Sequence, residues 1–590
     1  MSKLVTNNLK LFNSDQFIES FSELKYNNYY YFVGTSLPYP NDSTPPTLGD
    51  SVQTVLVDSY ETMLYGKRIT SDDVCRMTDR YDWVSNTVYT KYRHDNSELF
   101  GSKFYVCVDE GSSYSVFKCI DNNNGTPSTV SPASGDTSAD DDAYFTSDGY
   151  QWKYMYSISS SQFNKFATTA YIPVLVDANV VANAIAGSID NIEVTTSGSS
   201  YAAYTNGVFS EVRVGGNNLV YAIDATNSSS NSNFYTDSAI KITSGVGSGQ
   251  QRKVVGYQVS GSTRRVIIDS EFSVNPTTAS HYDISPLVTV SGDGSNAVAR
   301  AIVNSTSNSI NSIEITSRGS GYTYASATLS GNSGSVNASS SATLKVIISP
   351  RGGHGSNAAA ELAGHHVGIS TVFDADASDN KVINSNDFRT VGILKDPLQR
   401  EATLSVSSVS GTFSVGEKVT QNNSSFLAYG TVKTVNSTAL VLSNAYGYFA
   451  AGNSTFNLLV GNSSGSTAVC DLATQINLYF DQTTRVVGSL QTAQNFTPDE
   501  VVTQANGGNG YFYASNSTVV RLVNQKGNIT YSNSINYYIE GVSSEARFLV
   551  SNTALPDLIK GSGDVIYIEN FSPINKSNGQ TETIKLVLEF

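Results

Sequence analysis

Apolar and polar residues alternate in short runs along most of the chain after residue 186. Alternation with a period of two predicts β-strands, because successive side chains of a strand point to opposite faces of a sheet. Gly, Ser and Asn separate the runs, and these residues favour the turns between strands. The pattern therefore predicts a mainly β protein.

The first 185 residues follow a different pattern and contain the longer predicted helices. Apolar residues recur at helical spacing over 14–24, where Ser14 is the expected N-cap, and over 50–65. A short third helix is expected at 357–362, capped by Asn357. Four strands are predicted in the same N-terminal part, at 29–33, 104–108, 114–120 and 150–158. These elements indicate a small α+β core.

An internal repeat marks a predicted β module at 186–345. Residues 188–195 read Ser-Ile-Asp-Asn-Ile-Glu-Val-Thr, and residues 309–316 read Ser-Ile-Asn-Ser-Ile-Glu-Ile-Thr. Each run leads at the same offsets to a Gly and a Tyr, which are Gly198 and Tyr201, and Gly319 and Tyr322. Each copy is therefore expected to be a strand that enters a turn closed by tyrosine.

A second, weaker duplication lies nearer the C-terminus. Residues 413–420 read Phe-Ser-Val-Gly-Glu-Lys-Val-Thr, and residues 496–503 read Phe-Thr-Pro-Asp-Glu-Val-Val-Thr. Similar strand patterns follow each copy, which predicts two small β-barrels or sandwiches in tandem.

The expected domain organisation is a discontinuous core interrupted by inserted β modules. The core segments are 1–185, 346–400 and 551–590, and the inserted modules are 186–345, 401–480 and 481–550. The predicted fold class is thus mainly β, with a small α+β core from both termini and sandwich-like or barrel-like insertions.

Charge and composition narrow the class of partner. The formal net charge is −15, with 39% hydrophobic and 15% charged residues. A nucleic-acid partner is not expected, since phosphate binding requires an excess of Lys and Arg. The chain has neither an apolar leader at its N-terminus nor an uninterrupted apolar stretch of bilayer length, so we expect neither standard secretion nor membrane insertion.

Cysteine usage indicates folding in a reducing compartment. The four cysteines are scattered without metal-type pairing, at Cys75, Cys107, Cys119 and Cys470. Cys107 and Cys119 lie on strands of one predicted hairpin, but a reducing cytosol opposes a disulfide between them.

Five motifs outside the inserted modules resemble one known family. They are a Pro-Tyr-Pro-Asn-Asp turn at 38–42, a strand ending Cys-Ile-Asp at 119–121, an Asp-Gly-Tyr turn before a Trp-bearing strand at 148–156, a Phe-Arg strand ending in Pro at 387–397, and the final segment 563–590. In this order they resemble the baseplate wedge proteins of T-even-type contractile phages, the gene-eight product family. The matching residues are Pro38, Tyr39, Pro40, Cys119, Asp148, Gly149, Tyr150, Trp152, Phe388, Arg389, Pro397, Tyr567, Glu569, Asn570, Pro573 and Phe590.

The resemblance implies a structural role in the virion. It implies a homodimer within each wedge, contacts to other wedge proteins, assembly in the host cytoplasm, and interfaces that rearrange when the tail contracts. The matching segments cover about 1–185, 346–400 and 551–590, under half of the chain. The large insertions depart from the family pattern, so the packing of domains and the partner surfaces do not follow from it.

One cluster of residues suggests metal chemistry. Three histidines, His354, His365 and His366, lie near Glu361, Asp374, Asp376 and Asp379. Their spacing matches neither a His-Glu-x-x-His helix nor a calcium loop, while Gly352, Gly353 and Gly355 suit a tight loop. A structural loop is the favoured interpretation, no metal or other cofactor is expected, and any ion there would be structural.

Two further patterns are better explained without ligands. The acidic run of Asp136, Asp140, Asp141 and Asp142 suits a solvated loop more than a Ca²⁺ site. Residues 245–250 are rich in glycine but lack the Lys-Ser/Thr pair of a phosphate loop, so a hairpin turn is expected.

The sequence favours a structural protein over an enzyme, and no catalytic residues are assigned. An alternative is a tail protein whose inserted modules bind a glycan of the host surface, since aromatic faces stack on sugars. A polysaccharide depolymerase is the third possibility, and this activity would need paired carboxylates in a groove. Glu193 and Glu314 occupy equivalent repeat positions, although a repeat explains this without catalysis.

Overall fold

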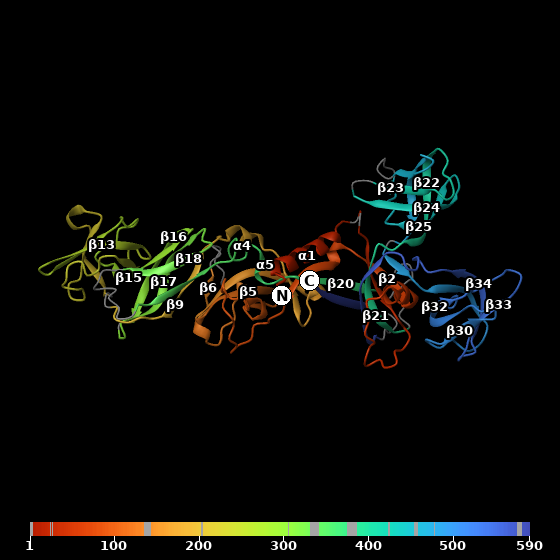
Figure 1. Ribbon diagram of the computed structural model, residues 1–590, viewed down its shortest axis with the longest axis horizontal. Helices are drawn as coiled ribbons and strands as arrows, with labels where there is room; N and C mark the ends of the chain where they lie inside the picture. Colours follow the sequence, from red (N-terminus) through yellow and green to blue (C-terminus); the bar gives the residue numbers. More distant parts are fainter. Residues whose placement is uncertain are drawn as a thin grey trace. The chain divides into compact units, whose positions relative to one another are not determined.

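The computed structural model describes residues 4–590 except 24, 26, 135–142, 202–204, 305, 331–340, 375–385, 423–424, 453–457, 477 and 575–580. It consists mainly of β-strands, which confirms the predicted class (Figure 1). The chain forms two compact units: unit 1 comprises Met1–Met77 and His365–Phe590, and unit 2 comprises Thr78–Gly364. The expected core segment 1–185 is therefore divided between the two units, because its strands pair with different parts of the chain.

Unit 1 contains an antiparallel sheet built from both ends of the chain. Its strand order is β28-β2-β1-β21-β35, with bounds β28 Tyr479–Asp481, β2 Met63–Ile69, β1 Tyr29–Gly34, β21 Phe388–Lys395 and β35 Asp564–Ile574. All six residues of β1 are buried, because β1 lies inside the sheet and is covered on both faces. The predicted strand at 29–33 is confirmed.

A second set of strands covers this sheet. β20 (His366–Phe373) pairs with β36 (Glu582–Glu589) and with the Val74–Met77 part of β3 (Val74–Asp79). Apolar side chains of both sheets form one core, in which Tyr31 and Val33 join Ile369 and Phe373. Phe17 and Phe21, at the C-terminal end of the first helix, pack against the same core.

The two predicted N-terminal helices differ from the observed ones. Helix α1 spans Asn7–Ser20 and is capped by Thr6, so Ser14 lies inside it, buried and bonded to the Leu11 carbonyl. Gln53–Asp58 form a π-helix that continues into α2 (Ser59–Thr62), and β2 begins at Met63. The prediction of a helix to residue 65 was wrong, because pairing with β1 overrides the helical spacing of this segment.

The tandem duplication folds into two closed six-stranded barrels, as predicted (Figure 1). The first has the order β22-β25-β24-β23-β26-β27, with bounds β22 Gln399–Ser410, β23 Lys418–Asn422, β24 Leu427–Val435, β25 Ala439–Tyr446, β26 Leu458–Gly461 and β27 Thr467–Thr474. The second has the order β29-β32-β31-β30-β33-β34, with bounds β29 Thr484–Leu490, β30 Val501–Gln504, β31 Asn509–Ser515, β32 Val519–Lys526, β33 Tyr537–Gly541 and β34 Arg547–Ala554. The strand order is the same in both, so the barrels are structural copies.

One glutamate in each barrel holds two loops together. Glu500 accepts hydrogen bonds from the backbone N–H groups of Thr497 (2.7 Å), Ser543 (3.0 Å) and Ser544 (3.0 Å). Glu417 accepts equivalent bonds from Ser414, Ser463 and Ser464 at 2.6, 3.3 and 3.0 Å. Burial acts to raise the pKa of both carboxyls, but these bonds outweigh it and lower the pKa of each.

Unit 2 contains a smaller sheet with the order β4-β5-β7-β6. Its bounds are β4 Tyr105–Asp109, β5 Ser113–Asn122, β6 Tyr144–Phe145 and β7 Tyr150–Ser159. The strands predicted at 104–108, 114–120 and 150–158 are thus confirmed. The short elements around this sheet are α3 (Ser160–Phe166), β8 (Tyr171–Pro173), α4 (Ala178–Asn183) and α5 (Ala358–Glu361), the last capped by Asn357 as predicted.

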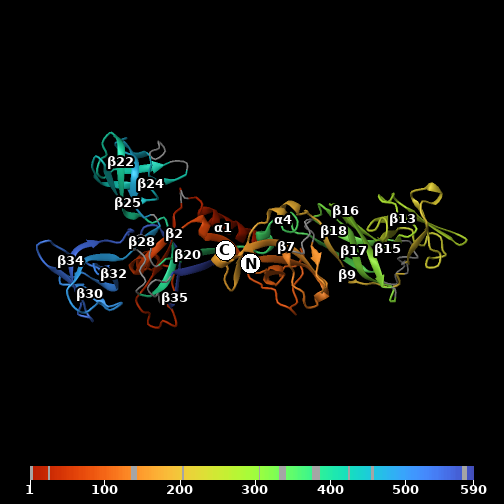
Figure 2. The same cartoon turned by 180° about the vertical axis from the view of Figure 1, so that it is seen from behind.

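The repeat-containing module of unit 2 is a nine-stranded sheet and a separate strand pair (Figure 2). The sheet order is β10-β11-β14-β13-β12-β15-β16-β17, with β18 also paired to β15. The bounds are β10 Thr205–Glu211, β11 Val220–Ile223, β12 Ser238–Ser244, β13 Gln251–Ser260, β14 Thr263–Ile268, β15 His281–Gly292, β16 Ser295–Asn304, β17 Ser309–Ser320 and β18 Ala325–Ser330. The separate pair is β9 (Ile189–Thr196) with β19 (Thr343–Ile348).

Both repeat copies contribute to one core. β17 begins one repeat position earlier than β9, and the equivalent residues Ile189 and Ile310 are both fully buried. Tyr201 and Tyr322, which follow the two strands, are also buried in this core. The predicted strand and turn tyrosine of each copy are therefore confirmed. Residues 245–250 connect the antiparallel strands β12 and β13, which confirms the predicted hairpin turn.

The four cysteines are free thiols. Cys107 lies opposite Val116, and Cys119 lies opposite Trp152, so the register does not bring the two cysteines together. Burial raises the pKa of Cys107 to about 12, which keeps this thiol protonated. Within the described part of the chain, no helix has the length and apolar character needed to cross a membrane.

The buried glutamates of the barrels yield a first prediction. Glu500→Ala should lower the free energy of unfolding by about 1–3 kcal/mol, because three backbone N–H groups lose their charged acceptor. The folded-state pKa of Glu500 is lowered, so its contribution is fully present above the unfolded pKa of about 4.3 and is lost as pH falls through the folded value. Urea unfolding of both proteins at neutral and acidic pH measures this difference.

Glu401→Ala is the matched control, since Glu401 forms an ion pair with Lys433 in which both side chains are about half exposed. Such a pair contributes at most about 1 kcal/mol. An equal loss of stability in both variants, or a Glu500 effect that grows in acid, would contradict the interpretation.

Candidate functional site

Three of the five segments that carry the family resemblance meet in unit 1 around the buried guanidinium of Arg389. Its side chain on β21 is 4% exposed. Its Nε and Nη2 atoms donate to the two carboxylate oxygens of Asp42 at 2.9 and 3.2 Å, and Nη1 donates to Asp387 at 2.7 Å. Nη1 also donates to the carbonyl oxygen of Ser36. The Arg389 hydrogen bonds lower the pKa of Asp42, so this carboxylate remains charged.

The Pro-Tyr-Pro turn and the C-terminal strand contact the same place. The Tyr39 hydroxyl donates to the Arg389 carbonyl at 3.0 Å, and burial raises its pKa. Thr390 donates from its hydroxyl to Asn570 on β35 at 2.8 Å, and Asn570 donates to the carbonyl of Pro46 at 3.0 Å. Three motifs separated by hundreds of residues therefore form one hydrogen-bonded cluster, which we call the terminal junction: Ser36–Pro46, Asp387–Thr390 and Asn570.

The remaining C-terminal motif residues lie in or next to β35 and directly after β36. Gly563 has φ +69°, and an added Cβ would lie 2.8 Å from the Pro397 nitrogen. The close approach of these two backbone segments therefore requires glycine. Tyr567 donates to Glu569 at 2.6 Å. The Phe590 ring lies 5.3 Å from that of Phe17 on α1, centroid to centroid. Phe388 is buried in the main core of unit 1, and Pro573 lies in β35.

In unit 2 the motif residues hold a loop against the sheet. Asp148 accepts the backbone N–H groups of Thr129 and Val130 at 2.8 and 2.9 Å and the hydroxyl of Thr146 at 2.5 Å. Burial acts in the opposite direction, yet these bonds lower the pKa of Asp148 to about 2. Gly149 has φ +84°, and the turn leads to the buried, stacked rings of Tyr150 and Trp152. Cys119 pairs in register with Trp152. The contacts of these residues are structural.

The histidines of the predicted cluster fall into two groups. In unit 2, His354 Nε2 lies 2.7 Å from Asp190, and burial lowers the pKa of His354. Glu361 bonds to Lys118 and accepts the N–H of Gly355 at 2.8 Å, so it fastens the glycine loop. In unit 1, His365 and His366 lie instead beside Glu589, a residue that sequence spacing cannot connect to them. Asp374 follows β20, whereas Asp376, Asp379 and the acidic run of Asp136, Asp140, Asp141 and Asp142 lie outside the described residues.

A polar groove of about 720 Å³ in unit 2 is lined by both repeat copies. Residues 190–195 of β9 and 311–315 of β17 form two of its walls, together with the exposed ring of Phe145. Its amide groups come from Asn123, Asn124, Gln151, Asn191 and Asn311. The groove therefore places neutral amide groups beside one aromatic face, and the nitrogens of Asn123, Gln151 and Asn191 already donate to protein oxygens.

Glu193 and Glu314, at equivalent repeat positions, both line this groove and are both neutralised by cations. Glu193 pairs with Lys91 at 2.7 Å and with Arg93. Glu314 pairs with Arg300 at 2.7 Å and with Lys241. Burial acts to raise the pKa of each carboxyl, but the paired cations lower both. A glycosidase acid requires a raised pKa, so these two carboxylates lack the electrostatics of that role.

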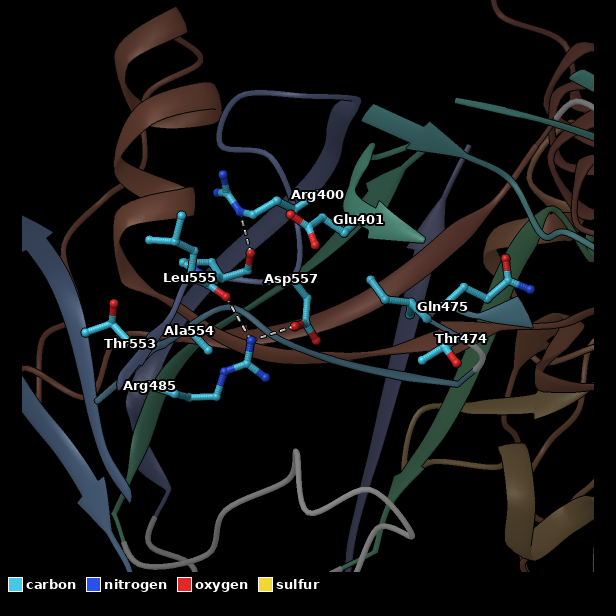
Figure 3. A pocket seen from close by; sticks show the side chains of 11 residues that line it. Arg400, Glu401, Thr474, Gln475, Arg485, Thr553, Ala554, Leu555 and Asp557 are labelled. Atoms are coloured by element: carbon cyan, nitrogen blue, oxygen red, sulfur yellow. Dashed lines mark hydrogen bonds and ion pairs between the residues drawn. The ribbon is translucent and has the colours of Figure 1, made fainter. Parts of the chain in front are cut away.

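A second hollow of about 440 Å³ lies in unit 1 where the two barrels meet residues 555–557, which lead from the second barrel toward β35 (Figure 3). Arg400 of the first barrel donates from Nε to the Pro556 carbonyl at 2.8 Å. Arg485 of the second donates to the Leu555 carbonyl and to Asp557, each at 2.8 Å. Both guanidiniums are thus bonded to residues 555–557. The hollow is therefore interpreted as the junction between the two barrels and this segment.

Comparison with known proteins identifies no relative: no protein-family model matches the chain, and no curated protein sequence matches it. Only the family resemblance indicated that the segments of the terminal junction belong together. The cations that pair with Glu193 and Glu314 were not foreseen, since Lys91 and Arg93 are about 100 residues from Glu193 and carry no motif.

The terminal junction yields a second prediction. Arg389→Ala should lower the free energy of unfolding of unit 1 by about 3–5 kcal/mol, because Asp387 loses its buried cation. Arg547→Ala on β34 is the control: its pair with Glu540 is about half exposed on both sides and should contribute at most about 1 kcal/mol. Urea unfolding of the full chain measures both, and similar losses in the two variants would contradict the assigned role of Arg389.

Proposed function

We propose that the chain is a structural subunit of the baseplate wedge of a contractile phage tail, where it assembles with other wedge proteins and transmits the contraction trigger. The observation that carries the proposal is the terminal junction. Three of the five motifs that resemble the wedge family contact one another there, around Arg389. Motifs that match by chance have no reason to meet in space, whereas motifs that define one family core do.

The way the barrels are attached supports a mechanical role. β21 and β35 are direct neighbours in the unit 1 sheet, and both barrels lie between them in sequence. Four strands of the sheet, β2, β1, β21 and β35, therefore pair without this region, and only the edge strand β28 comes from it, between the two barrels. A subunit that transmits a rearrangement needs such rigid bodies on a fixed core.

An exposed apolar surface on unit 1 supports assembly. Leu9 and Phe12 lie three residues apart on α1 and are 49% and 59% exposed, and Leu4 and Val5 just before the helix are exposed as well. Residues three apart lie on the same helix face. Contiguous exposed apolar surface of this kind is typical of protein–protein contact. We propose a homodimer and neighbouring wedge subunits as partners, and no catalytic role.

Location in the particle tests this proposal. Antibodies against the chain should label the baseplate end of the tail in particles of the phage that encodes it, seen by electron microscopy. Label elsewhere on the particle, or particles that lack the chain, would refute the proposal.

A variant of the exposed helix face sharpens the same test. Phe12→Asp should reduce incorporation of the chain into tails, because it places a charge in an assembly surface, while the melting temperature of the isolated protein stays unchanged. Val415→Asp is the control, since Val415 is a similarly exposed apolar residue (68%) on the first barrel. Equal incorporation of the two variants would show that the α1 face is not an assembly surface.

The groove of unit 2 favours a second function, binding of a host-surface glycan. Neighbouring sugar hydroxyls fit an array of amide donors and acceptors, and the exposed Phe145 ring can stack on a sugar face. The volume of the groove lies within the range of small-ligand sites.

Glycan-array binding by the full chain tests this second function. Phe145→Ala should weaken binding about tenfold, because the ring contact is lost. Tyr324→Ala is the matched control, since Tyr324 is an equally exposed aromatic residue (66%) that does not line the groove. No binding to any glycan, or equal losses in the two variants, would refute the role of the groove.

A further inference from the structure

His365, His366 and Glu589 bring three metal-ligand groups together in unit 1. His366 begins β20, Glu589 ends β36, and the two residues are direct partners in the antiparallel register. His365 immediately precedes β20, and its ring stacks on that of His366 with centroids 4.6 Å apart. One ligand atom from each of the three side chains lies within 4.8 Å of the other two.

The donor set indicates the class of ion. Imidazole nitrogens suit Zn²⁺, Cu²⁺ and Ni²⁺, whereas Mg²⁺ and Ca²⁺ prefer oxygen ligands alone. Zinc–nitrogen and zinc–oxygen distances of about 2.0–2.2 Å place tetrahedral ligands about 3.4 Å apart. Rotation of the Glu589 side chain, which is 65% exposed, together with a small rotation of the partly exposed His365 ring, can bring the three donors to that separation.

The ion pair between Glu589 and Lys10 does not prevent metal binding. The Lys10 ammonium on α1 lies 3.4 Å from the Glu589 carboxylate, and the two side chains are 30% and 65% exposed. Exposed pairs of this kind are weak and screened by salt. A divalent ion held by two further ligands replaces such a contact without exposing a buried charge.

We propose that His365, His366 and Glu589 form a binding site for a divalent first-row transition-metal ion, such as Zn²⁺. Three protein ligands leave one position for water. The ion fastens the end of β36 to the start of β20, and thereby secures the C-terminal strand to the core of unit 1. Because the ligands come from segments over two hundred residues apart, binding stabilises the folded chain alone.

Zinc titration of the untagged, chelator-treated full chain tests the site. We expect one Zn²⁺ per chain, measured by competition with a chromophoric chelator, and a rise in melting temperature on its addition. His365→Ala and Glu589→Gln should each weaken binding at least tenfold. These two positions are chosen because both side chains are more exposed than that of His366 and their loss spares the core.

Two further variants separate ligation from other roles. Glu589→His supplies a different ligand at the same position and should keep the zinc affinity that Glu589→Gln loses, whereas a role limited to charge would be lost in both. His281→Ala, which removes an exposed histidine from β15, should bind as the unmodified chain does. Co²⁺ in place of Zn²⁺ should give visible absorption that vanishes in His365→Ala. No stoichiometric binding, or binding unaffected by His365→Ala and Glu589→Gln, would overturn the proposal.

Discussion

Antiparallel pairing between strands from opposite ends of the chain is the constraint on which unit 1 depends. β21 pairs with β1 on one side and with β35 on the other, so residues near 30, 390 and 570 must meet before the sheet exists. Closing such long loops costs conformational entropy and slows folding. The buried pairing of Arg389 with Asp42 and Asp387 stabilises the meeting point, and α1, β20 and β36 pack on the sheet that results.

Several carboxylates in this charge-poor chain serve as acceptors for the backbone N–H groups of loops. Asp148, Glu361, Glu417 and Glu500 each receive backbone N–H groups from a loop that has no strand partner of its own. Such loops arise wherever short strands connect, and their N–H groups must be satisfied when buried. These acidic residues therefore supply hydrogen-bond acceptors that a neighbouring strand would otherwise provide.

Local patterns predicted much of the fold, and long-range contacts account for what they missed. Aromatic and β-branched runs bounded by turn residues predicted the strands around residues 30, 105, 115 and 150, and the Glu417 and Glu500 duplication predicted the tandem barrels. The segment 63–65 has helical spacing, but its pairing with β1 makes it a strand. The division of the first 185 residues between two units also depends on partners hundreds of positions away. For the same reason, sequence spacing does not show that His354 lies apart from His365 and His366, or that Glu589 lies beside these two.

The point at which the barrels join the sheet has a consequence for the history of such a chain. Lys395 at the end of β21 and Asp564 at the start of β35 face each other in register, so residues 396–563 leave and re-enter at one spot. A hairpin turn could bridge that spot and keep the pairing of β2, β1, β21 and β35, but the edge strand β28, which lies between the barrels in sequence, would be lost. Residues 396–563 thus have the connectivity of one inserted segment, which also supplies Tyr479 and Phe480 to the core of unit 1. The two copied barrels have the form expected of an inserted segment that was doubled in place.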